Sequence, residues 1–183
     1  MPPLANQHAA LARVGSLVFR VEAGAWADYL GVARHHYRAK RPATVCQVWR
    51  LVADWADDST PPLLWRAGGY SRLAGVLVVS YPVLQAAARN QATGNRYCTP
   101  LDKRIGAGRL NREVRTISRV IIHPLYRGLG LAGLFVADAL DRIGSPVVEA
   151  FARMGEFVPF FRQAGMEEVR LLGRPVYYCW RTA

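Results

Sequence analysis

Apolar and β-branched residues dominate the stretch from Val114 to His123, and such a stretch is typical of a buried strand. Pro124 ends it, since proline has no N–H group to donate to a sheet. Glycines follow at positions 128 and 130, after which apolar residues recur at helical spacing as far as Ile143. The pattern therefore predicts a strand, a tight glycine turn and a helix in direct succession.

The hydrophobic periodicity of the remaining chain predicts a series of shorter elements. Strands are expected at residues 16–22, 45–55, 63–67, 73–81, 146–152, 167–172 and 176–180. Helices are expected at residues 26–37, 84–92 and 155–163, with a short one around residues 9–14. Gly68-Gly69 is expected to connect strands 63–67 and 73–81 as a pair. Residues 93–111 are rich in glycine, arginine and polar side chains and are expected to form a long loop, which in a compact domain is more often functional than idle.

The composition is that of a globular protein, with 51% hydrophobic and 20% charged residues in a chain of 183. This length suits one domain, which we place at residues 16–183 after an N-terminal extension of residues 1–15. Three widely spaced cysteines predict neither a zinc ribbon nor a disulfide framework, so a reducing, cytoplasmic setting is expected. No apolar stretch reaches the length of a membrane span and the N-terminus does not resemble a signal peptide, so no membrane partner is expected.

A net charge of +11 is the unusual feature of the composition. It favours a polyanionic partner such as nucleic acid, an anionic membrane face or a phosphorylated cofactor, although a protein can also be merely basic. The positive residues concentrate in residues 34–50 and 84–119, which also carry tyrosines that can stack on bases. A solvated basic surface is the alternative. The residues expected to contact nucleic acid are Arg38, Lys40, Arg41, Arg96, Tyr97, Lys103, Arg104 and Arg109.

The glycine turn is a candidate anion site. Backbone N–H groups at a helix N-terminus lack intrahelical partners, and the helix dipole favours negative charge there. Gly128 and Gly130 would let the backbone approach a pyrophosphate closely, and Arg127 would add a charge-assisted contact. The spacing matches neither a Walker A loop nor the dinucleotide-binding fingerprint. The alternative is an ordinary connection between a strand and a helix.

Arg-x-x-Gly-x-Ala at residues 127–132, directly after His-Pro-x-Tyr at residues 123–126, resembles the acyl-CoA-binding motif of the GNAT N-acyltransferases. The resemblance implies a single α/β (α+β) domain with a mixed, mostly antiparallel central sheet flanked by helices. It also implies acetyl-CoA or another acyl-CoA as cofactor. The thioester carbonyl would lie near the backbone of Val120, Ile121 and Ile122. The pyrophosphate would lie on the turn formed by Arg127, Gly128, Leu129, Gly130, Leu131 and Ala132.

The sequence departs from that family at two positions. Many GNAT enzymes use a tyrosine in the last helix to protonate the leaving thiolate, and Phe161 stands at that position here. An asparagine often lies seven residues earlier, where this chain has Met154. Another group would therefore serve as the acid, or the donor would differ from a standard acetyl-CoA.

Several short motifs together resemble one branch of the family more closely. This branch contains the Mom-type phage proteins that modify adenine in DNA, and the acetyltransferase-like domain of certain archaeal ABC-type ATPases. For this chain the resemblance implies transfer of an acyl-type group to the N6 amine of adenine. The motifs are His36-Tyr37-Arg38, Leu110-Asn111, residues 117–120, residues 159–161 and Gly165-Met166.

Glu149 is the first catalytic candidate, because it lies in the middle of an apolar strand. A carboxylate is costly to bury unless it is paired, and burial would raise its pKa toward that of a general base. The alternative is a side chain that points to solvent or pairs with an arginine. Ser118 and Arg119 alternate across the central strand, so one of them faces the cleft, and we choose Ser118.

His36 and Tyr37 are the remaining catalytic candidates. Adjacent residues of a helix face different directions, so only one of His35 and His36 is expected to enter a cleft, with surface or capping roles as the alternative. Tyr37 would serve as an acid or a stacking platform, unless it packs in the core. His123 is expected to be a positioning residue. No spacing of histidines and carboxylates indicates a metal site.

Three hypotheses of function follow. The leading one is a GNAT-fold transferase that modifies the adenine N6 amine in DNA, as Mom-type proteins do. The second is an acetyl-CoA-dependent N-acetyltransferase that acts on a small amine or a protein. The third is a GNAT fold without catalytic activity that serves as a binding module.

Overall fold

The computed structural model describes residues 10–37, 41–56, 71–98, 103–152, 157, 159–171 and 174–180. Its centre is an eight-stranded sheet in the order β1-β2-β3-β4-β5-β6-β8-β7. Neighbouring strands are antiparallel except for β5 and β6, which are parallel. The strands are β1 (Ala12–Val14), β2 (Leu17–Ala23), β3 (Val45–Trp55), β4 (Leu73–Ser80), β5 (Val114–Ile122), β6 (Val147–Phe151), β7 (Glu167–Leu171) and β8 (Arg174–Trp180).

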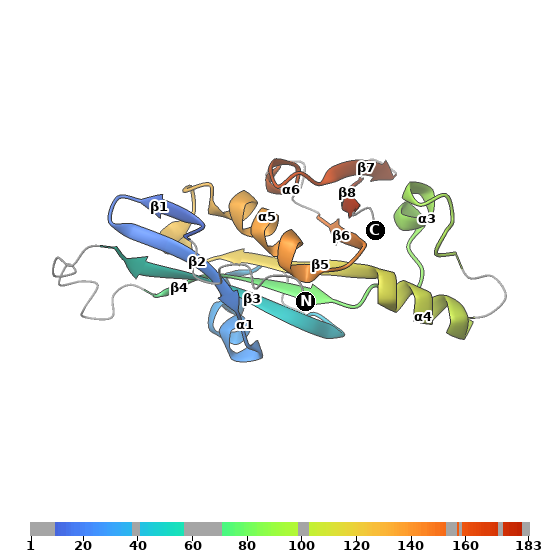
Figure 1. The fold of residues 1–183 in the computed structure, drawn as a ribbon, viewed down its shortest axis with the longest axis horizontal. Coiled ribbons are helices and arrows are strands. Elements are labelled where there is room, and N and C mark those ends of the chain that lie inside the picture. Colours follow the sequence, from blue (N-terminus) through green and yellow to red (C-terminus); the bar gives the residue numbers. More distant parts are fainter. Residues whose placement is uncertain are drawn as a thin grey trace, which may run out of the picture.

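Helices cover both faces of this sheet (Figure 1). α5 packs on one face in the largest hydrophobic cluster, with Phe135 and Val136 completely buried. α1 packs on the opposite face, where Tyr29 and Val32 contact Val76 and residues near it. The helical elements are α1 (Trp26–Val32), the 3-10 turn η1 (Ala33–His35), α3 (Ala87–Ala92), α4 (Lys103–Glu113), the 3-10 turn η2 (Pro124–Tyr126), α5 (Leu131–Ile143) and α6 (Phe160–Gln163).

The ladder between β5 and β6 is short. It joins three residue pairs, from Val114↔Val147 to Thr116↔Glu149. Opposite it, on the β4 side, Val78 pairs with Arg119 and Val79 with Ile117, so Ser118 is an extra residue in β5 that forms a β-bulge. No further pair joins β5 to β6 among the described residues, and the two strands diverge beyond the bulge.

Most predicted elements are confirmed, including the strand, glycine turn and helix around which the chain is organised. Residues 12–14 form a strand that pairs with β2, so the short helix expected around residues 9–14 is wrong. Gly15 has a φ of +56° and supplies the tight reversal of this hairpin. Residues 63–67 lie outside the described part of the chain. β4 pairs with β3 and β5.

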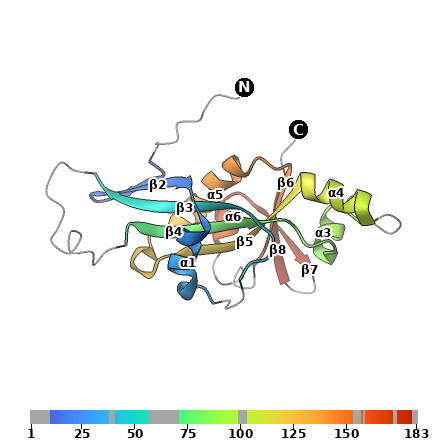
Figure 2. The ribbon, with the colours of Figure 1, turned by 90° about the horizontal axis from the view of Figure 1, so that it is seen from below.

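The long loop expected at residues 93–111 is also wrong over its second half, where α4 begins at Lys103. Gly106 and Gly108 disfavour a helix by about 1 kcal/mol each, and for that reason the sequence suggests a loop. Packing reverses this preference, since the buried Leu110 contacts a small cluster at the end of the sheet that includes Tyr97. Figure 2 shows α4 extending from that end of the sheet.

Within the described residues no helix is long and apolar enough to cross a membrane. The three cysteines, Cys46, Cys98 and Cys179, are free thiols.

Candidate active site

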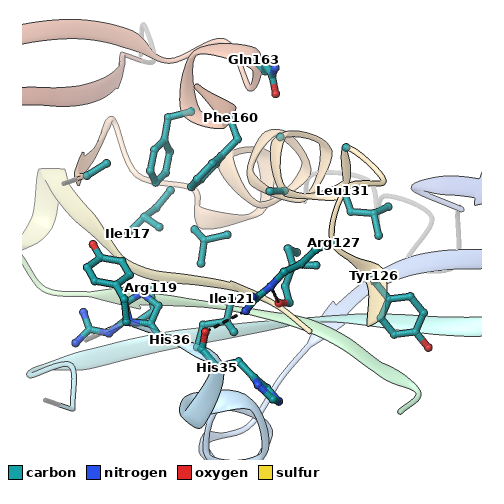
Figure 3. Close-up of a pocket in the computed structure, with 18 of the residues that line it drawn as sticks. His35, His36, Ile117, Arg119, Ile121, Tyr126, Arg127, Leu131, Phe160 and Gln163 are labelled. Atoms are coloured by element: carbon teal, nitrogen blue, oxygen red, sulfur yellow. Dashed lines mark hydrogen bonds between the residues drawn. The ribbon is translucent and has the colours of Figure 1, made fainter. Parts of the chain in front are cut away.

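A cavity of about 570 Å³ opens where β5 and β6 diverge. Its walls come from both faces of the sheet: Val120 packs in the cluster around α5, and Ile121 packs in the cluster around α1. Leu131 and Phe160 line the α5 side, while His36 lines the α1 side (Figure 3). The cavity therefore crosses the sheet.

The glycine turn forms one end of this cavity. Gly128 and Gly130 have φ values of +80° and +72°. Residues other than glycine adopt this left-handed backbone conformation at a cost of roughly 1–2 kcal/mol. A Cβ atom at either position would meet open space. Gly130 is the N-cap of α5, a helix of 13 residues. The first turn of α5, whose N–H groups have no intrahelical partners, lines the cavity with Leu131, Ala132 and Gly133, as the predicted anion site requires.

Arg127 extends from this turn to the other face of the sheet. Its Nε donates to the carbonyl of Ile122 at 3.1 Å, and its Nη2 donates to the carbonyl of His35 at 3.0 Å (Figure 3). The side chain is exposed and lines the cavity. It thus lies within reach of an anion on the turn while it also contacts η1.

His36 and Tyr37 form the rim of the cavity on the α1 side. Their rings stack with centroids 4.5 Å apart and planes at 27°, and Tyr37 is 58% exposed. The structure brings both catalytic candidates together here. His35 also lines the cavity, although the sequence suggests that only one of the two histidines would do so.

Both Ser118 and Arg119 line the cavity, whereas the alternation argument allows only one of them. The bulge at Ser118 breaks the alternation. The Ser118 hydroxyl donates to the carbonyl of Val78 at 3.1 Å and accepts from the Ser80 hydroxyl at 2.9 Å, so it is engaged with β4. Arg119 is 6% exposed and donates to the Ser118 carbonyl at 2.7 Å. Strand alternation in the sequence does not single out Arg119, because a bulge leaves no local signal that would identify it.

His35 and His123 meet edge to face, with ring centroids 5.0 Å apart. Desolvation and the positive charges of Arg34 and Arg127 lower the pKa of His35. Desolvation and the neighbouring His35 and Arg34 lower the pKa of His123. His123 also accepts the N–H of Leu125 through its Nδ1 at 3.4 Å, which caps η2 and matches the positioning role expected for it.

Glu149 is not in the cavity. Its side chain and that of Arg89 are both completely buried. Arg89 donates from Nε to Oε2 at 2.9 Å and from Nη2 to Oε1 at 2.8 Å, and the Thr116 hydroxyl donates to Oε1 at 2.8 Å. The structure therefore favours the alternative of an arginine pair over a general base, because the carboxylate already accepts three hydrogen bonds and does not reach the cavity.

Aromatic side chains close the cavity near α6. Phe161 is buried and stacks on Tyr177 with centroids 5.2 Å apart. Desolvation and the neighbouring Glu168 raise the pKa of Tyr177, which does not line the cavity. The position that carries an acidic tyrosine in many GNAT enzymes thus has no hydroxyl group here. Met154, at the second departure from the family, lies outside the described residues.

Three of the residues expected to contact nucleic acid converge on one carboxylate. Arg96, Tyr97 and Arg109 all donate to Glu113, at 2.8, 2.9 and 3.2 Å. Partial burial acts to raise the pKa of Glu113, but these hydrogen bonds outweigh it and lower that pKa. Tyr97 is buried, so it is not available for base stacking. Arg41 is exposed, the side chains of Lys103 and Arg104 on α4 are not described, and Arg38 and Lys40 lie outside the described residues.

No protein-family model matches the chain, and no curated protein matches it. Its fold is shared with solved structures. The crystal structure of Arabidopsis thaliana NAA60 in complex with acetyl-CoA aligns with a TM-score of 0.54 and 13% identity, over 89% of this chain and 99% of that chain. A Bacillus subtilis acetyltransferase in complex with CoA aligns with a TM-score of 0.49 and 12% identity, over 90% and 99%. AtaT complexed with acetyl-methionyl-tRNAfMet aligns with a TM-score of 0.48 and 15% identity, over 90% and 94%. The likeness to NAA60 shows that this chain has the GNAT fold, as the sequence predicts.

Proposed function

We propose that the protein is an acyl-CoA-dependent N-acyltransferase. The observation that carries this proposal is the position of the glycine turn, which places the N-terminus of α5 at one end of a cavity that crosses the sheet. NAA60, whose fold this chain shares, was solved in complex with acetyl-CoA. In this chain, the combination of an anion site and diverging strands suits a long, phosphorylated thioester.

The residues present fit such a cofactor. The turn from Gly128 to Gly130 offers N–H groups and open space to a pyrophosphate. Along an antiparallel edge, alternate residues direct their N–H groups to opposite sides, so at least one of Val120, Ile121 and Ile122 directs its N–H toward the diverging side, where a thioester carbonyl would accept it. An acyl-CoA would supply an acyl group already activated as a thioester. Holding it beside the amine contributes roughly 7–11 kcal/mol to lowering the barrier.

Proton transfer in this proposal falls to the rim of the cavity. The acceptor amine loses one proton as its nitrogen bonds to the acyl carbon, and the departing sulfur gains one. His36 and Tyr37 lie at the cavity mouth on the α1 side, opposite the α5 turn, and both can exchange protons. They take the place of the absent hydroxyl at Phe161.

The binding of cofactor tests this proposal directly. Gly130→Glu should abolish CoA binding measured by calorimetry, because a side chain and a negative charge would occupy the anion site. Gly94→Glu is a matched control, since Gly94 also has a positive φ and open space around it but does not line the cavity. Wild-type affinity for CoA in Gly130→Glu would contradict the assignment, and undetectable binding to the wild type would reject acyl-CoA as the donor.

Two classes of acceptor substrate are candidates. A small amine or a protein fits the fold without further assumptions. Modification of the adenine N6 amine in DNA, as in Mom-type proteins, is favoured by the net charge of +11 and by the His36–Tyr37 stack at the cavity mouth, where Tyr37 is exposed, because aromatic side chains stack on bases that have been flipped out of a duplex.

Two measurements distinguish these acceptors. Mass spectrometry of nucleosides from cells that express the protein would reveal a modified adenine. If about five basic residues contact phosphates, affinity for duplex DNA should also fall roughly 10²–10³-fold between about 50 and 200 mM salt. Unmodified adenine, together with DNA binding no stronger than that of a lysine peptide of equal charge, would leave the small amine or protein as the acceptor.

A further inference from the structure

Arg127 connects two parts of the cavity that belong to opposite faces of the sheet. It follows η2 directly and begins the glycine turn, and its two hydrogen bonds reach the end of β5 and the last residue of η1. A guanidinium group has five N–H groups. Two of them hold the carbonyls of Ile122 and His35, and three remain for an anion on the turn.

The carbonyl of His35 matters because it belongs to the peptide group that leads into His36. The N–H of His36 donates to the carbonyl of Ala33 at 3.0 Å, which closes η1. A carbonyl and an N–H of one planar peptide unit are therefore both fixed, and the rings of His36 and Tyr37 follow immediately. The position of the rim thus depends on a side chain that belongs to the anion-binding turn.

We infer that Arg127 is a positioning residue that couples the cofactor turn to the His36–Tyr37 rim. This inference rests on the proposed function, because it assigns the anion on the turn to the cofactor. An anion that contacts the remaining N–H groups restricts the guanidinium further, and the restricted guanidinium holds the His35 carbonyl more firmly. Binding of the cofactor therefore orders the rim that receives the acceptor. By linkage, an ordered rim strengthens cofactor binding by the same factor.

Amide hydrogen exchange of the purified protein measures this coupling without any need for activity. Arg127→Lys keeps the positive charge for the turn, but an ammonium group cannot reproduce the fixed fork that bonds both carbonyls. We expect amide exchange in residues 33–37 to become about tenfold faster in this variant, because the loss of one charge-assisted hydrogen bond changes an opening equilibrium by about that factor. We also expect saturating CoA to slow exchange there severalfold in the wild type but not in Arg127→Lys.

Arg34→Lys is the matched control, since Arg34 lies in the same segment but donates to the ring of His35 rather than to a backbone carbonyl. Its exchange at residues 33–37 should remain within about twofold of wild type. Unchanged exchange in Arg127→Lys, or an equal acceleration in Arg34→Lys, would overturn the inference. If the wild type binds no CoA, the proposed cofactor is rejected. The exchange rates of the two variants without CoA would still test the contact between Arg127 and the rim.

Discussion

The pair formed by Arg89 and Glu149 allows a sharp test of whether Glu149 is structural or catalytic. Glu149→Gln removes the negative charge and keeps the size of the side chain, so Arg89 remains buried without a counter-ion. Removing one partner of a buried ion pair costs roughly 3–5 kcal/mol, which is a large part of the 5–15 kcal/mol that typically stabilises a domain. With a urea dependence of about 2 kcal/mol per molar, the unfolding midpoint should fall by roughly 1.5–2.5 M.

Urea unfolding followed by circular dichroism measures this shift, and two controls isolate its cause. The double variant Arg89→Met/Glu149→Leu removes both charges and should recover to within about 2 kcal/mol of wild type, because replacing a whole buried pair by apolar side chains is often nearly neutral. Arg96→Gln disrupts the exposed pair with Glu113 and should cost no more than about 1 kcal/mol.

The transfer rate of the folded fraction completes the test. If Glu149 is structural, Glu149→Gln should retain a turnover close to wild type at temperatures where it remains folded. A variant with an unchanged unfolding midpoint and a turnover reduced by about 10²-fold, the usual effect of losing a general base, would refute the structural assignment and restore the catalytic one.

Three further predictions concern the cavity. The pKa values of His35 and His123 are lower than the usual 6.5, so the unfolded state binds protons more readily than the folded state. The free energy of unfolding should therefore be highest above about pH 6.5 and decline as the pH falls below that value. Thermal unfolding between about pH 8 and 5 checks this, and the decline should be smaller in His123→Gln. Tyr37→Phe should lower the transfer rate by about 10²-fold at saturating substrates if its hydroxyl moves a proton, and a near wild-type rate would remove it from the mechanism. Phe161→Tyr adds a hydroxyl to a side chain that lines the cavity and should rescue Tyr37→Phe at least partly, which kinetics of the double variant would show.

The unit from Val114 to Ile143 could be predicted from the sequence because its signals are local. β-Branched residues favour the strand, Pro124 ends it, Gly128 and Gly130 permit positive φ values, and helical spacing follows. Each of these effects acts within a few residues of the position concerned, so a sequence window contains all of it. The GNAT fold could also be predicted, since the order of elements and the motif on the turn lie in the linear chain.

Features that depend on pairing between distant residues could not be predicted. α4 forms despite Gly106 and Gly108 because Leu110 packs against residues from other elements. The bulge at Ser118 results from the register of β5 against β4, and it brings Arg119 into the cavity wall.

Two side chains show the same limit most clearly. Glu149 suggests catalysis as long as its surroundings are unknown, and its partner Arg89 lies 60 residues earlier in the chain. Arg127 is recognisable as part of the cofactor turn, but its bond to His35 spans 92 residues. Sequence periodicity determines which face of an element is buried. Only the tertiary structure decides which charged and polar groups meet, because the cost of burying a charge depends on partners that no local pattern specifies.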